Sequence, residues 1–137
     1  MDNTKEDLNM KIGMTGTATV LVTEDNTAQK VGSGLLPVYA TPSMIALLEM
    51  AACNCVSDYL EEGTSSVGTL INVKHLAATP IGMNVTATAT LTEIDGRRLV
   101  FDIEVHDETT LIGQGTHERF VVSSEKFLSK TNAKLQK

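Results

Sequence analysis

The stretch Met44–Val56, which reads MIALLEMAACNCV, decides the fold of this chain. Its Met, Leu and Ala residues favour helix, and Thr41 and Pro42 suit the N-cap and the first turn of that helix. Gly63 predicts where the helix stops, after a last turn near Leu60. A helix that is apolar almost all round is typical of a buried helix, and this one is too short to span a membrane. We therefore expect the rest of the chain to wrap around it.

Alternating apolar and polar residues predict strands on both sides of the helix. The long strands are expected at residues 14–23, 67–77, 83–92, 99–106 and 111–122, with a possible short one at 27–31. Asp95-Gly96 predicts a tight hairpin. Gly113 and Gly115 predict a bulge or a close backbone approach in the last strand. The four strands after the helix are expected to form a meander.

This order of elements predicts an α+β domain. Strands joined by short turns usually pair antiparallel, and a sheet with one apolar face needs a cover, for which the helix is the only candidate. A curled antiparallel sheet of five to six strands around one long central helix is the hotdog fold. We expect this domain at residues 14–124, between a flexible segment at 1–13 and a polar tail at 125–137.

Composition and charge exclude several classes of function. The net charge of −6 argues against non-specific binding to nucleic acid or to an anionic membrane. The N-terminus, MDNTKEDLNMKIG, has no apolar signal-peptide core, which predicts a cytoplasmic protein. Cys53 and Cys55 point to different sides of the helix and have no zinc spacing, so we expect buried thiols and no metal site. No cofactor motif is present, so we expect no cofactor.

Glu49 is the one charged residue of the central stretch, and two interpretations of it stay open. It is either a partly exposed or dimer-facing carboxylate, or a general base or carboxylate nucleophile. Burial of a charge without a partner is costly, which favours a functional role. His75 shares a strand face with Ile71 and Val73, the face that should meet the helix. It is either a satisfied core histidine or the acid/base partner of Glu49.

Other polar residues have weaker local claims. Thr41 is an N-cap, or it helps the helix N-terminus to hold a developing oxyanion. Arg119 makes a surface or dimer ion pair, or it contacts an anionic ligand or the acid/base pair. His106 and His117 have weaker claims than His75, and His106 has a solvent-facing parity. Lys74 and Arg97-Arg98 could contact phosphates, although Arg97-Arg98 is more simply the exposed end of a hairpin. No P-loop, dinucleotide fingerprint or G-x-S-x-G elbow is present.

Several stretches together resemble the hotdog-fold acyl-CoA thioesterases, and within them the fluoroacetyl-CoA thioesterase-like family. They are Ala40-Thr41, Met44-x-x-Leu47-x-Glu49, Ala52-Cys53, Gly68-Thr69, Val73 to Pro80, Asp95 to Leu99 and Gly113 to Arg119. The resemblance implies a catalytic set at Thr41, Glu49 and His75, with supporting roles near the acyl group for Gly68 and Arg119. It also implies an acyl-CoA substrate and a homodimer with its sites at the subunit interface.

The loop before the helix departs from the family pattern. An aromatic gate residue of the fluoroacetyl-CoA enzyme matches Leu35 here, beside Gly32-Ser33-Gly34. We therefore predict hydrolysis of a small or medium acyl-CoA and do not carry over the fluorinated substrate. Glu49 would attack the thioester directly or activate water. The alternatives are a non-catalytic dimer that binds acyl-CoA or another ligand and, less favoured, a hotdog enoyl-CoA hydratase.

Overall fold

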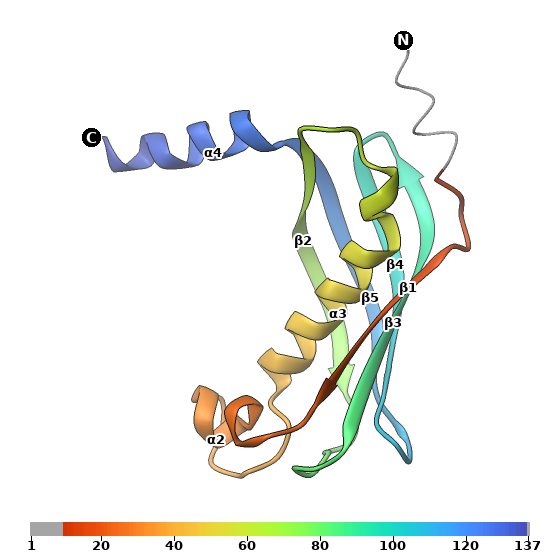
Figure 1. Ribbon diagram of the computed structural model, residues 1–137, viewed down its shortest axis with the longest axis vertical. Helices are drawn as coiled ribbons and strands as arrows, with labels where there is room; N and C mark the ends of the chain where they lie inside the picture. The colour runs from red at the N-terminus through yellow and green to blue at the C-terminus, as the bar shows by residue number, and fades with distance from the viewer. Residues whose placement is uncertain (1–9, 137) are drawn as a thin grey trace.

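The computed structural model describes residues 10–136, and Figure 1 shows a curled sheet wrapped around one long helix. The elements are β1 (Thr15–Leu21), η1 (Glu24–Asn26), α2 (Ala28–Val31), α3 (Thr41–Val56), η2 (Ser57–Tyr59), β2 (Thr64–His75), β3 (Asn84–Asp95), β4 (Arg98–His106), β5 (Leu111–Ser123), α4 (Ser124–Asn132) and η3 (Ala133–Leu135). The predicted α+β class and hotdog fold are confirmed. None of the helices among these residues is long and apolar enough to cross a membrane.

The sheet has five strands in the order β1-β3-β4-β5-β2, all antiparallel. Strands β3, β4 and β5 form the expected meander, and Gly96, with a φ of 63°, closes the predicted hairpin between β3 and β4. Strand β2 does not join that meander, because it pairs with β5 at the far edge. Residues 76–83 connect β2 to β3 and contain a turn at Ile81-Gly82, where Gly82 has a φ of 105°. Pro80 in this connection bridges to Val38.

The short strand expected at residues 27–31 is wrong, because this segment is the helix α2. Its ends carry ordinary helix signals. The Thr27 hydroxyl accepts a hydrogen bond from the Lys30 N–H, and Gly32 ends the helix in the left-handed region at a φ of 84°. Within residues 10–136, one bridge, from Thr27 to Tyr39, links this segment to extended backbone.

One face of α3 forms the core together with the inward side chains of the sheet. The buried helix residues are Met44, Leu47, Leu48, Ala51, Ala52, Cys55 and Val56. The inner faces of β3 and β4 supply Val85, Ala87, Ala89, Leu91, Leu99, Phe101, Ile103 and Val105. Small residues let backbones approach closely: a Cβ at Gly16 would overlap the Cys55 backbone, and one at Gly113 would lie 2.7 Å from the Met44 sulfur. The close approach predicted at Gly113 is thereby confirmed.

The described residues leave the other face of α3 uncovered, which corrects the expectation of a helix buried all round. Met50 is 56% exposed, and Glu49 and Cys53 are partly exposed. The helix also starts one residue earlier than expected, because Ala40 is the N-cap and Thr41 is the first helical residue. It ends at Val56 instead of near Leu60.

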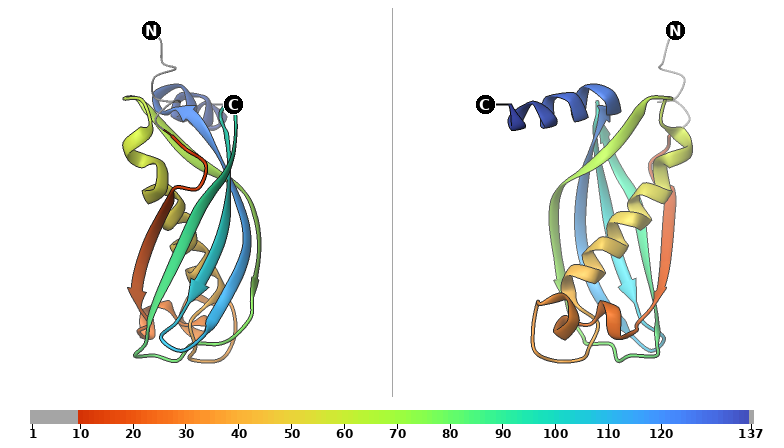
Figure 2. Two further views of the ribbon diagram at one scale, coloured as in Figure 1. Left: turned by 90° about the vertical axis from the view of Figure 1, so that its right-hand side faces the viewer. Right: turned by 60° about the vertical axis from the view of Figure 1, so that its left-hand side comes forward.

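Both ends of the predicted domain have additional structure. Met10 is buried in the core, whereas residues 1–9 of the segment expected to be flexible lie outside the described residues. The polar tail contains the helix α4, which leaves the end of β5 and projects away from the body (Figures 1 and 2).

Candidate active site

Thr41 and His75 meet where α3 begins and β2 ends. The Thr41 Oγ1 lies 2.7 Å from the His75 Nδ1. Thr41 makes no capping bond, so its hydroxyl is free for this contact. His75 therefore faces the helix, as its strand parity predicted, but it meets the first turn and not Glu49.

The environment of His75 favours a neutral imidazole. Burial lowers the pKa of His75 below its ordinary value of 6.5, and a backbone hydrogen bond near Ala77 offsets part of this effect. A neutral imidazole has one nitrogen that donates and one that accepts. The Nε2 atom is buried and has no hydrogen-bond partner among the described residues. A buried orphan nitrogen is unusual in a protein and suits a group that handles a proton during a reaction.

A pocket of about 360 Å³ adjoins this pair, and Ser33, Val38, Tyr39 and Leu76 are among its lining residues. The Tyr39 hydroxyl donates to the Ser43 carbonyl at 3.2 Å, and burial raises the pKa of Tyr39 to about 12. Tyr39 thus stays protonated and braces the first turn of α3.

The N-terminus of α3 supplies donors for negative charge. The first helical hydrogen bond runs from the Met44 N–H to the Ala40 carbonyl at 3.0 Å. The N–H groups of Thr41 and Ser43 therefore have no acceptor within the helix. Together with the positive end of the helix dipole, they can stabilise an oxyanion that develops beside Thr41.

Glu49 belongs to a second cluster, two turns further along α3. Eight residues separate it from Thr41, which corresponds to about 12 Å along the helix axis. Its Oε2 lies 3.4 Å from the Arg119 Nη1, and the two side chains are 39% and 7% exposed. Ser66 holds the guanidinium in place, because Arg119 donates from Nε to the Ser66 hydroxyl at 2.8 Å and from Nη2 to the Ser66 carbonyl at 2.9 Å. A fixed, buried cation thus orients a carboxylate that remains open on one side.

His117 completes this cluster, although its position in the chain gave it a weaker claim to a functional role than His75. Its Nδ1 lies 2.9 Å from the Leu70 carbonyl, which can only accept, so Nδ1 carries the proton. Its Nε2 then accepts from the Arg119 Nη1 at 3.2 Å. Burial, together with the Arg119 charge, lowers the pKa of His117 and keeps the ring neutral. The Phe101 ring stacks on it with 6.0 Å between centroids. His117 and Arg119 are two residues apart on β5, so their side chains point to the same face of the sheet. This spacing could have identified His117 as part of the site.

Gly68 lies directly against the Glu49 carboxylate. A Cβ at this position would overlap the Glu49 Oε2 and would lie 3.3 Å from the His117 Cε1. Only glycine leaves room for the carboxylate in this orientation. A register shift between Gly68 and Leu70 marks a bulge at the same point of β2.

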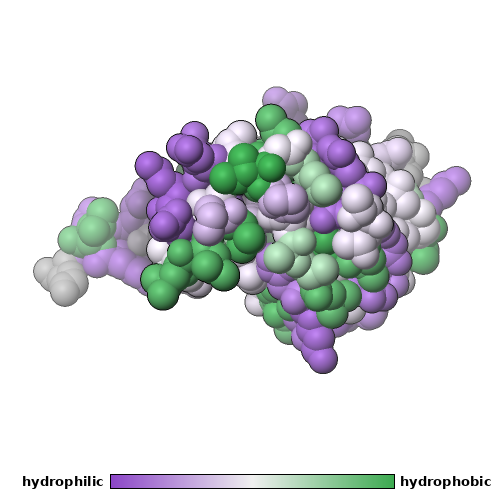
Figure 3. Space-filling model, turned by 90° about the horizontal axis from the view of Figure 1, so that it is seen from below, coloured by the Kyte–Doolittle hydropathy of each residue, from purple (hydrophilic) through white to green (hydrophobic). Residues whose placement is uncertain are grey.

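The sequence-predicted residues therefore form two groups within one chain. Thr41 and His75 make one, and Glu49, Gly68 and Arg119 make the other, with no hydrogen bond from Glu49 to His75 among the described residues. Leu35 lies in the loop between α2 and α3, is 88% exposed and is not among the described residues that line the pocket beside Thr41 and His75. Figure 3 views the molecule from the end at which α2 lies and shows hydrophobic residues gathered on the surface among hydrophilic ones.

The remaining polar candidates have structural roles or face solvent. Arg98 pairs with Glu118 at 3.0 Å and with Glu93 at 3.1 Å. Lys74 and His106 are exposed. Both cysteines are free, with Cys55 buried and Cys53 partly buried.

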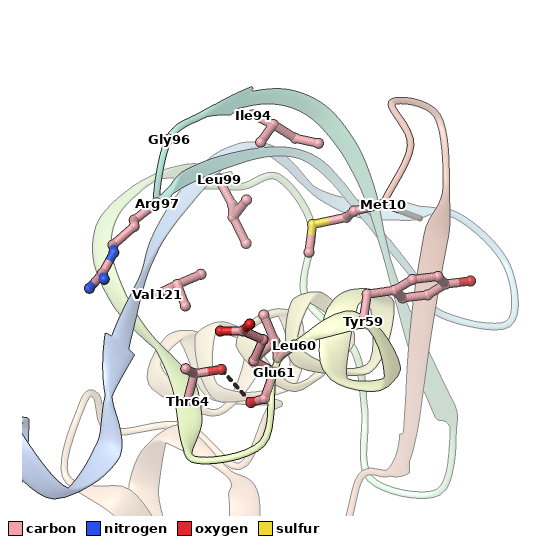
Figure 4. A pocket seen from close by; sticks show the side chains of 10 residues that line it. All are labelled: Met10, Tyr59, Leu60, Glu61, Thr64, Ile94, Gly96, Arg97, Leu99 and Val121. Carbon is pink, nitrogen blue, oxygen red and sulfur yellow. Dashed lines mark hydrogen bonds between the residues drawn. The ribbon is translucent and has the colours of Figure 1, made fainter. Parts of the chain in front are cut away.

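A second pocket, of about 280 Å³, lies near the other end of α3 (Figure 4). Its wall is mixed: it includes the apolar Leu60, Ile94 and Leu99 and the polar Glu61 and Thr64. The Arg97 side chain points away from the other labelled side chains in Figure 4. The Thr64 hydroxyl donates to the Glu61 carbonyl at its edge, at 2.7 Å. Neither of the two groups of candidate residues lines this pocket.

Comparison with known proteins decides the family. The family model described as fluoroacetyl-CoA-specific thioesterase matches residues 22–125. The chain belongs to this family. The resemblance found in the sequence and the assignment to the acyl-CoA thioesterases, a class of thioester hydrolases, are confirmed.

Individual relatives agree with the family assignment. The chain is 47% identical over 97 residues to the fluoroacetyl-CoA thioesterase of Streptantibioticus cattleyicolor, covering 71% of this chain and 70% of that protein. A solved structure of the fluoroacetyl-CoA thioesterase FlK superposes with a TM-score of 0.87 at 39% identity, over 91% of this chain and 97% of that one. A hot-dog-like protein from Thermanaerovibrio acidaminovorans has a TM-score of 0.86 at 24% identity, over 100% of this chain and 99% of that one, and supports the fold alone.

Proposed function

We propose that this thioesterase hydrolyses a small or medium acyl-CoA with Thr41, Glu49 and His75 as its catalytic residues. The observation that carries the proposal is the pairing of a Thr–His couple at a helix N-terminus with an oriented, accessible carboxylate on the same helix face. A solved structure of an FlK variant is a complex with fluoroacetate and CoA, covering 86% of this chain at 40% identity. This complex supports an acyl-CoA substrate for the present protein.

The chemistry follows from these groups. The thioester carbonyl would sit beside Thr41, where the hydroxyl and the free N–H groups stabilise the oxyanion. Glu49 attacks the carbonyl carbon, or it takes a proton from a water that attacks. The C–S bond then breaks. Neutral His75 takes up the proton that the consumed water gives up, directly or from Glu49, and passes it to the departing CoA thiolate. In either route one water is consumed, and the free acid and CoA are released. Gly68 and Arg119 act by positioning Glu49.

We further propose a homodimer in which each site combines the two groups from different copies. Strands β1 and β2 are the two edges of the sheet, and Leu70 and Ile71 on β2 are 43% and 37% exposed. The uncovered face of α3 carries Met50. If two copies pair their β2 edges antiparallel, their α3 helices also run antiparallel, as two-fold symmetry requires. Glu49 of one copy would then approach the partner's Thr41 and the partner's His75.

The pH dependence of the reaction tests the role of His75. Because burial lowers the pKa of His75, the ring is neutral above this pKa, and a reaction that needs neutral His75 loses rate as the pH falls through it. We expect kcat/KM to fall on the acid side with a midpoint below 6.5. An NMR titration should give the same midpoint for the His75 ring proton, identified by its absence in His75→Ala. A midpoint above 6.5 for that proton would contradict this role.

A panel of acyl-CoAs of increasing chain length, followed with a thiol reagent, tests the function itself. We expect thiol release to be fastest with small or medium acyl groups, because Leu35 stands at the position of the aromatic gate residue. Saturable binding with no thiol release on any substrate would instead support a ligand-binding dimer. Hydration of an enoyl-CoA without hydrolysis would support a hydratase.

Location in the cytoplasm stays a prediction of the sequence.

A further inference from the structure

The C-terminal helix α4 has an apolar stripe that nothing covers within the described residues. Phe127, Leu128 and Leu135 are 41%, 58% and 85% exposed. Phe127 and Leu128 are neighbours in α4 and lie side by side on its surface, whereas Leu135 follows in η3. Lys126 and Lys130 are four residues apart and lie on the side of α4 opposite Leu128, and Lys134 follows in η3. The helix is therefore amphipathic, with a basic side.

The charge of this segment is opposite to that of the rest of the chain. Residues 124–137 have four lysines and one glutamate, whereas the first 123 residues have seven basic and sixteen acidic side chains. A basic, apolar helix attached to an acidic body is suited to an acidic surface that also exposes apolar side chains. A second copy of this chain offers such a surface.

Two contacts fix the direction of α4 at the start of β2. The Ser124 N–H donates to the Gly63 carbonyl at 2.9 Å, and the hydroxyls of Ser65 and Ser124 are hydrogen-bonded. From this point the helix projects past the β2 side of the sheet, as Figure 1 and the right-hand view of Figure 2 both show. This is the side on which a second copy would join the β2 edge.

Antiparallel pairing of two β2 edges brings the start of β2 in one copy beside the end of β2 in the other. The helix α4 would therefore reach the end of the partner at which β2 stops and α3 begins. That end exposes Leu35, Leu36 and Leu76, which are 88%, 64% and 51% exposed, and it carries the exposed acidic residues Glu24 and Asp25. Apolar and acidic side chains are thus available to the stripe and the lysines of α4.

We propose that the apolar stripe of α4 packs on the partner's Leu35 and the partner's Leu36 and forms an outer wall of the partner's Thr41–His75 pocket. This inference rests on the dimer of the proposed function. It extends that proposal by assigning part of the substrate mouth to the C-terminal helix of the other copy. Leu35 occupies the position of the aromatic gate residue of the fluoroacetyl-CoA enzyme. In the proposed dimer, residues of both chains would surround this position.

The variant Phe127→Ser/Leu128→Ser tests this contact by removing the stripe. The matched control is Ser129→Ala/Ala133→Ser, which alters the side of the same segment that is turned away from Phe127 and Leu128. Sedimentation should show a dimer dissociation constant at least about tenfold higher for the stripe variant, because two large apolar side chains leave the interface. The control should match the wild type, as should the circular dichroism of both variants. Equal dissociation constants for the two variants would overturn the proposal.

Cross-linking distinguishes this contact from the dimer as a whole. A Leu35→Cys chain and a Leu128→Cys chain of different mass are mixed and oxidised. We expect a disulfide-linked heterodimer, and no linked species when either variant is oxidised alone. A dimer in sedimentation without this cross-link would overturn the role of α4 and leave the proposed function standing. A monomer in sedimentation at all concentrations would overturn both.

Discussion

Replacing Glu49 with alanine is expected to lower kcat/KM for acyl-CoA hydrolysis by about a thousandfold. In the proposed reaction this carboxylate is the nucleophile or the general base, and removal of such a group typically costs about a hundred- to ten-thousandfold. Its position explains why no neighbour can replace it. Arg119 is a cation, and His117 next to it is committed to the Leu70 carbonyl and to Arg119.

The measurement is steady-state thiol release by purified Glu49→Ala, with Glu49→Gln to separate charge from shape. Glu104→Ala, which removes an exposed carboxylate from β4, is the matched control and should keep wild-type activity. The melting temperature of each variant reports whether the fold is intact. A folded Glu49→Ala that retains more than about a tenth of the activity would show that Glu49 is not catalytic.

Replacing Gly68 with alanine is expected to lower kcat/KM by about a hundredfold while the protein stays folded. The added Cβ would overlap the Glu49 Oε2, so the carboxylate must move away from its present orientation. Gly68 does not have a positive φ, so alanine causes no backbone strain. A displacement of about 1 Å at a catalytic group can cost about a hundredfold in rate.

The effect of Gly68→Ala should therefore appear mainly in kcat, with little change in melting temperature. Asn72→Ala, on an exposed position of the same strand, is the control. If Gly68→Ala hydrolyses acyl-CoA at the wild-type rate, Gly68 does not set the orientation of Glu49. If it loses activity only because it unfolds, the melting temperature will show this directly.

Much of the fold could be predicted because its signals are local. The composition of Met44–Val56 predicted the central helix, alternation predicted the five long strands, and Asp95-Gly96 predicted the hairpin. The position of β2 could not be read in this way, because its pairing with β5 joins residues far apart in the chain. The helix at Ala28–Val31 was missed although Thr27 and Gly32 are ordinary end signals, because four residues show no clear periodicity.

The site was only partly predictable for a related reason. Helix periodicity places Thr41 and Glu49 on one face, but the rise of the helix also separates them by about 12 Å, so one chain cannot bring both to His75. Tertiary contacts decide which strand residue each one meets. Thr41 does not cap the helix because it is the first helical residue, and its hydroxyl bonds to His75 instead. His117 belongs to the site through its contacts with Arg119 and Leu70.

Mixing two inactive variants tests most directly whether each active site combines Thr41 and His75 of one copy with Glu49 of the other. Glu49→Ala and His75→Ala chains are unfolded together, refolded as a mixture and assayed for thiol release. In a heterodimer one site would have both changes and the other would be intact, so a statistical mixture should regain about one quarter of wild-type activity. A mixture of Thr41→Ala and His75→Ala, which alters the same group in both chains, should regain none. If the Glu49→Ala and His75→Ala mixture is no more active than its separate components, the two-chain site is contradicted.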